Sequence, residues 1–155
     1  MINSYELLNS LVAALRDIPE LVAEMGGDAN RIYAYHDSYP TKVSSVHALH
    51  TMPAPAIMAV YQGISPDGLG AMDVWKHRIV LYLRAGPSSA PGPYQYLFRL
   101  IVKGSPTAAN GVPLCNWTIN ESCYPMDLPR QDRQSDAEAL DYFEVPLSFT
   151  EIGDD

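Results

Sequence analysis

The strongest constraint on the fold is an alternating stretch of sequence between residues 75 and 84. Its odd-numbered residues are Trp75, His77, Ile79, Leu81 and Leu83, and its even-numbered residues are Lys76, Arg78, Val80, Tyr82 and Arg84. A period of two places the sets on opposite faces of a β-strand. We expect the odd-numbered face to belong to the core and the even-numbered face to meet water or a partner. Because an apolar run over 56–62 and a turn-forming region over 63–68 precede the strand, the sequence predicts a long β-hairpin.

A helix is predicted at the N-terminus by a different period. One apolar stripe recurs at helical spacing and comprises Leu7, Leu8, Leu11, Val12 and Leu15. Asn3 is a suitable N-cap because Glu6 follows three residues later. Beyond Pro19, we expect Asp17 to cap a second short turn that runs through Met25 and ends at the Gly26–Gly27 pair.

A second helix is predicted over 93–103. Its apolar residues, Tyr94, Leu97, Phe98 and Ile101, follow helical spacing. Pro93 suits the first position of a helix, and Gly104 with Pro106 should end it.

The remaining segments predict short strands and loops. We expect a short strand near 31–35, a helical turn over 45–51, a strand containing Cys115, Trp117 and Ile119, and an exposed loop over 124–138. Phe143, Val145, Leu147 and Phe149 should face inward on a final strand, with Glu144, Ser148 and Thr150 facing out. Pro146 within that strand indicates an edge position or a bulge, because proline donates no ladder hydrogen bond. The element order predicts an α+β fold with a mostly antiparallel sheet, a long hairpin, an N-terminal helix and a second helix near 93–103.

Length and charge limit the classes of protein that remain. The chain has 155 residues, which fits one domain spanning 1–155. Its 10 basic and 18 acidic residues give a net charge of −8, and no basic stripe is present for gripping phosphates. No apolar run reaches the roughly 20 residues of a membrane helix. The N-terminus does not resemble a secretory signal, so we expect synthesis in a cytoplasm, where the two cysteines, Cys115 and Cys123, would be free thiols.

Candidate catalytic and metal motifs are incomplete. His47 and His50 are spaced as HxxH, with His36 and Asp37 upstream, but the further ligands of a usual zinc site are missing. His77 lies on the apolar strand face, where a hydrogen-bonded core histidine is expected. The sequence has neither a G-x-S-x-G elbow nor a phosphate loop. We therefore predict no enzymatic activity, no metal site and no cofactor, and keep a small metal-dependent hydrolase using the His36–His50 region as the alternative from another class.

The element order resembles that of the tail-terminator and head–tail joining minor tail proteins of long-tailed bacteriophages. The resemblance lies in the leading helix, the hairpin built from 56–62 and 74–84, the helix near 94–103 and the last strand over 143–149. It implies a structural virion protein, assembled in the host cytoplasm, that forms a ring, usually a hexamer, at the head-proximal end of the tail tube. Its partners would be other copies of itself, the tail tube protein and a neck or connector protein, with DNA passing through unbound. The alternative within the same class is a neck connector or another minor virion protein.

A subunit interface follows as a hypothesis from charge. The even-numbered hairpin face carries Lys76, Arg78, Tyr82 and Arg84, and acidic residues gather around Asp132, Asp136 and Glu138. A head-to-tail ring requires two complementary surfaces on each subunit. The ten tyrosines suit interfaces and half-buried core positions equally well. We expect the basic face of one copy to dock against the acidic residues of the next.

Overall fold

The computed structural model describes residues 3–35, 54–66, 73–84, 91–103, 123–125, 132–135 and 141–153, and it confirms the predicted α+β class. The helices are α1 (Ser4–Arg16), α2 (Pro19–Glu24), the short 3₁₀ helix η1 (Ala29–Arg31) and α4 (Pro91–Lys103). The strands are β1 (Ile32–Tyr35), β2 (Ala56–Pro66), β3 (Asp73–Arg84), β4 (Cys123–Pro125), β5 (Asp132–Ser135) and β6 (Asp141–Gly153).

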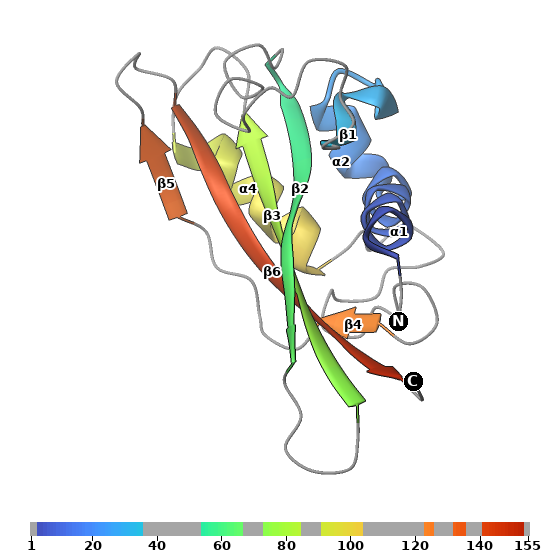
Figure 1. The fold of residues 1–155 in the computed structure, drawn as a ribbon. Coiled ribbons are helices and arrows are strands. Elements are labelled where there is room, and N and C mark those ends of the chain that lie inside the picture. Colours follow the sequence, from blue (N-terminus) through green and yellow to red (C-terminus); the bar gives the residue numbers. More distant parts are fainter. Residues whose placement is uncertain are drawn as a thin grey trace.

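The strands form one mixed six-stranded sheet in the order β1-β2-β3-β6-β4, and β5 also pairs with β6. Only β1 and β2 are parallel among the described pairs. The β2–β3 hairpin and the β3–β6 pair form the centre of the sheet, and Figure 1 shows these three strands as long, twisted arrows. The prediction of a mostly antiparallel sheet with a long hairpin is therefore confirmed.

The hairpin is longer than predicted and contains a β-bulge. β2 continues to Pro66, although we expected a turn to begin at Gly63. The register shifts between Tyr61 and Gly63, so that Gln62 is the extra residue, and Gly63 has a φ of 142°. Positive φ is open to glycine because it has no Cβ. The bulge lets the strand continue with a changed direction where the sequence indicated a turn.

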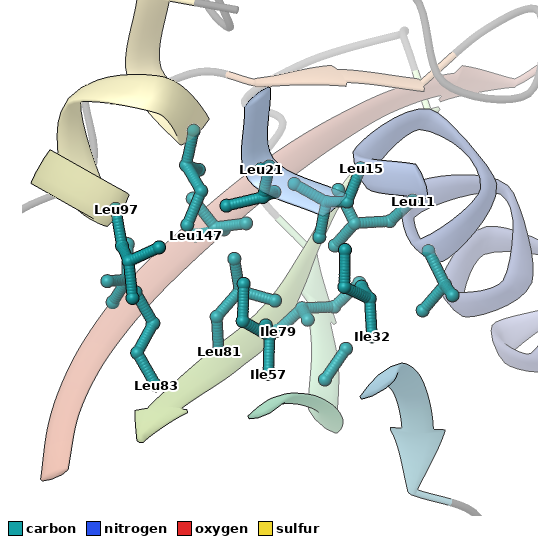
Figure 2. Packing of buried hydrophobic residues seen from close by; sticks show 14 of the residues in the cluster. Leu11, Leu15, Leu21, Ile32, Ile57, Ile79, Leu81, Leu83, Leu97 and Leu147 are labelled. Atoms are coloured by element: carbon teal, nitrogen blue, oxygen red, sulfur yellow. The ribbon is translucent and has the colours of Figure 1, made fainter. Parts of the chain in front are cut away.

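The main core lies between the helices and one face of the sheet. It joins the apolar stripe of α1 to inward-facing residues of α2, α4, β2, β3 and β6. Figure 2 shows Leu11 and Leu15 of α1, Leu21 of α2 and Leu97 of α4 gathered over Ile79 and Leu81 of β3. The odd-numbered face of β3 is thus buried from His77 to Leu83, as predicted, whereas Trp75 is only half-buried. The four inward residues of the last strand also belong to the core.

A second apolar cluster lies on the opposite face of the sheet. It contains Ala56, Met58, Val60, Val80 and Tyr82, and Tyr33 and Tyr35 pack against it. The expectation that the whole even-numbered face of β3 meets water or a partner is therefore wrong at Val80 and Tyr82. The reason is that β2 is apolar on both faces, so Met58 and Val60 lie opposite Tyr82 and Val80 and are buried with them.

The helix ends agree with the sequence except at two points. Asn3 caps α1 by accepting a hydrogen bond from the backbone N–H of Tyr5 at 2.8 Å. Asp17 is the C-cap of α1, and the N-cap of α2 is Ile18, so the expected capping role of Asp17 is wrong. α4 begins at Pro91 rather than Pro93. Pro93 still lies in the first turn, where backbone N–H groups have no partner within the helix.

The C-terminal strand has two partners on its outer edge. β5 pairs with residues 141–144 of β6 and β4 pairs with 149–151, so the predicted exposed loop over 124–138 contains strand segments. Pro146 lies between these two pairings. In the described part of the chain, the outer edge at Pro146 carries no paired strand, which agrees with the predicted edge position. The predicted turn over 45–51 and the strand around Cys115 to Ile119 lie outside the described residues.

Candidate functional site

Three polar side chains form a hydrogen-bonded trio inside the sheet. The Tyr61 hydroxyl lies 2.8 Å from Nδ1 of His77, and Nε2 of His77 lies 2.9 Å from Oε2 of Glu151. The trio therefore links β2, β3 and β6. His77 has no exposed surface and Glu151 is 2% exposed. The prediction that His77 is a hydrogen-bonded core residue is confirmed.

Strand alternation explains how the trio comes together. Glu151 continues the inward-facing series of β6 by one step beyond Phe149, and its register partner is Trp75. His77 is the register partner of Phe149, one pair further along β3. Tyr61 is the last residue of β2 before the bulge and lies on the same face as Ile57 and Ala59. The sequence pattern indicates His77 as a buried histidine but indicates neither Tyr61 nor Glu151 as its partner.

Both ring nitrogens of His77 are engaged, which defines what the trio can do. With Glu151 ionised, Nε2–H donates to the carboxylate, and Nδ1 either accepts from the Tyr61 hydroxyl or donates to it when the ring is protonated. A buried charge is tolerated when it is hydrogen-bonded in this way. No solute can reach the imidazole without an opening of the sheet, so the arrangement suits the joining of three strands better than acid–base catalysis on a substrate.

A second polar group lies on the other face of the sheet, beyond the bulge. Lys76 and Arg78 of β3 are flanked by small residues of the neighbouring strands at the same register. Gly63 and Ser148 lie beside Arg78, and Ser65 and Thr150 lie beside Lys76. We call Ser65, Lys76, Arg78, Ser148 and Thr150 the hydroxyl–cation patch. Arg78 is exposed, and Thr150 is 3% exposed with no hydrogen-bond partner for Oγ1, so the expectation that Thr150 faces solvent is wrong.

The residues predicted for a subunit interface are only partly brought together. Lys76, Arg78 and Arg84 share one face of β3, and Lys76 and Arg84 are half-buried. Tyr82 is 9% exposed within the second apolar cluster, so it is not available for a surface contact. Asp132 lies in β5, opposite Glu144 in the sheet register, and Asp136 and Glu138 lie outside the described residues. Because Glu144 also lies opposite Tyr82, Asp132 belongs to the same sheet as the basic residues rather than to a separate layer.

Among the residues that the structure describes, no three histidine, cysteine or carboxylate side chains come close enough to hold a metal ion. His36, Asp37, His47 and His50, on which the hydrolase alternative rests, lie outside those residues. None of the described helices has the length and apolar character needed to cross a bilayer.

Comparison with known proteins leaves the family open. No protein-family model matches the sequence, and no curated protein matches it significantly. The class of protein defined by the fold is an α+β domain with helices on one sheet face and an extended hairpin.

Proposed function

We propose that the chain is a structural subunit that forms a ring, most simply a hexamer, at the head-proximal end of a bacteriophage tail tube. The observation that carries the proposal is the β2–β3 hairpin, which continues past the helical layer and carries basic residues on its far face. Figure 1 gives a view of β2 and β3 running beyond the ends of the helices. Ile64 lies on the helix side of the sheet, opposite His77, and is nevertheless 38% exposed.

A projecting hairpin suits ring assembly for a physical reason. A closed ring is built from a surface that docks onto a different surface of the next copy. An element that extends beyond its own core can reach a neighbour without disturbing that core. The buried trio lies at the base of the projection and ties it to β6, which would hold the hairpin in one orientation.

The charge of the chain suits the same role. A ring through which DNA passes must not retain phosphates, and a net charge of −8 opposes such retention. The basic residues Lys76 and Arg78 are few, so they fit a contact with an acidic protein surface better than a phosphate track. The imidazole of His77, which has no exposed surface, offers no competing catalytic proposal.

The proposal is tested by looking for rings on tail tubes. Purified chain would be mixed with assembled tail tubes that lack a terminal ring and imaged by negative-stain electron microscopy. Light scattering after size-exclusion chromatography would give the mass in solution. We expect a ring at one end of the tubes. A chain that stays monomeric and leaves both tube ends bare would contradict the proposal.

A further inference from the structure

The hydroxyl–cation patch has the chemistry of a carboxylate receptor. Its register positions on β2, β3 and β6 contain two cations and three hydroxyls and no acidic residue; Thr150 is buried, Lys76 is half-buried, and Arg78 is the exposed cation. Gly63 lies beside Arg78, and no heavy atom lies within 4 Å of the point where a Cβ on Gly63 would stand. Arg78 is itself exposed. Arginine binds carboxylates through two parallel hydrogen bonds, which gives geometry as well as affinity.

The complementary charge lies on the helical layer. We call the segment from Arg16 to Arg31 the acidic corner, because it carries four carboxylates against two guanidiniums; the carboxylates are Asp17, Glu20, Glu24 and Asp28. Asp17, Glu24 and Asp28 are exposed. Both guanidiniums are bound to the backbone of their own chain, where Arg16 donates to the Ile32 carbonyl at 2.8 Å and Arg31 to the Pro55 carbonyl at 3.2 Å.

The two surfaces lie on opposite sides of the subunit. α1 and α2 pack against the sheet face that carries Ile79 and Leu81, whereas Lys76 and Arg78 lie on the reverse face. Figure 1 shows α1 and α2 together on one side of the long strands. A contact between these surfaces therefore joins two copies in a head-to-tail manner, and such a contact forms a ring when its rotation closes.

We propose that the hydroxyl–cation patch of one copy receives the acidic corner of the next copy, with Arg78 as the main cation and Glu24 as the main carboxylate. The inference rests on the proposed ring and names its contact. It replaces Asp132 as the acidic partner, because Asp132 lies in the same sheet as the cations. Such a contact sets the register of neighbouring subunits and weakens as salt is added.

Charge reversal with complementation tests the pairing. Arg78→Glu and Glu24→Arg would each be assembled alone, and then mixed in equal amounts, with ring formation followed by light scattering and electron microscopy on tail tubes. We expect each variant alone to need roughly tenfold or more protein for half-assembly, because like charges then meet. The mixture should recover wild-type assembly, since every patch in an alternating ring faces a corner of opposite charge.

Two controls keep the outcomes distinct. Arg99→Glu changes an exposed residue of α4 outside both surfaces and should assemble like the wild type. Circular dichroism should show each variant folded, and Arg78→Gln, which removes charge without reversing it, replaces Arg78→Glu if that variant unfolds. Normal assembly of both reversal variants, or a mixture that stays impaired, would overturn the pairing while leaving the ring. Failure of the wild type to assemble on tail tubes would overturn the ring and the pairing together.

Discussion

Removal of the Glu151 carboxylate is the sharpest test of how the sheet is held together. In Glu151→Ala, Nε2 of His77 loses the acceptor that lies 2.9 Å away, in a place where the imidazole has no exposed surface. Water cannot replace the carboxylate without entering the sheet. The variant also opens a cavity beside Phe149, the neighbour of Glu151 on the inward face two residues earlier.

The expected loss of stability follows from the burial of the pair. Leaving a buried donor without its acceptor costs about 1–3 kcal/mol, and more where the lost acceptor is a carboxylate. Tyr61→Phe removes only the hydroxyl that binds Nδ1 and should cost about 1–3 kcal/mol. Because domains of this kind unfold with only about 5–15 kcal/mol, Glu151→Ala should be close to the limit of folding at 37 °C.

Urea unfolding followed by far-ultraviolet circular dichroism would measure both losses. The two substitutions share His77, so their effects should couple by about 0.5–3 kcal/mol in a double-mutant cycle. The combined replacement Tyr61→Phe, His77→Leu and Glu151→Met removes the three hydrogen-bonded groups together and should be more stable than Glu151→Ala alone.

Two results would refute this reasoning. A loss below about 1 kcal/mol for Glu151→Ala would mean that solvent or another group readily compensates His77. A combined apolar variant as unstable as Glu151→Ala would mean that packing volume, rather than hydrogen bonding, determines stability at this position.

Three further predictions concern other parts of the chain. Thr150→Val should raise the free energy of unfolding by about 1 kcal/mol in the same urea assay, because the Thr150 hydroxyl is buried without a partner; a loss would show that the hydroxyl has one. Asn3→Ala should lower the free energy of unfolding by about 1 kcal/mol, because the backbone N–H of Tyr5 loses its side-chain acceptor. Asn3→Asp, which keeps an acceptor at this position, is the matched control. The wild-type chain should leave duplex DNA unshifted in a gel at micromolar protein and physiological salt, because its net charge is −8; a shift that disappears with added salt would contradict this.

Much of the fold could be predicted because hydrophobic periodicity is local. The stripe of α1, the alternation of β3 and the inward residues of β6 each repeat over several turns or pairs, and all lie where their period places them. The weaker predictions failed where pairing with a distant strand decides the outcome. β5 is polar by composition, yet it forms a strand because the first residues of β6 offer a free edge to it.

Two features of the sequence conceal the partners of His77. The last strand was expected to end near Thr150, although continuing its odd-numbered series one step would have placed Glu151 on the core face. The bulge at Gln62 could not be recognised from alternation, because one inserted residue changes which side chains oppose each other. With the bulge, Ile64 lies opposite His77, whereas unbroken pairing from Tyr61 would have placed Gly63 there.

The position of the trio connects the fold to the proposed assembly. Phe149, the register partner of His77, is the last inward-facing residue of β6 in the main core, and Glu151 follows it on the same face. Hydrogen bonds between His77 and both Tyr61 and Glu151 join three strands at this boundary. Directional bonds between neighbouring strands fix their register more strictly than apolar contacts do. A hairpin fixed at its base in this way holds Arg78 at one position relative to the rest of the subunit. A ring contact that depends on charge pairing requires the same position of Arg78 in every copy.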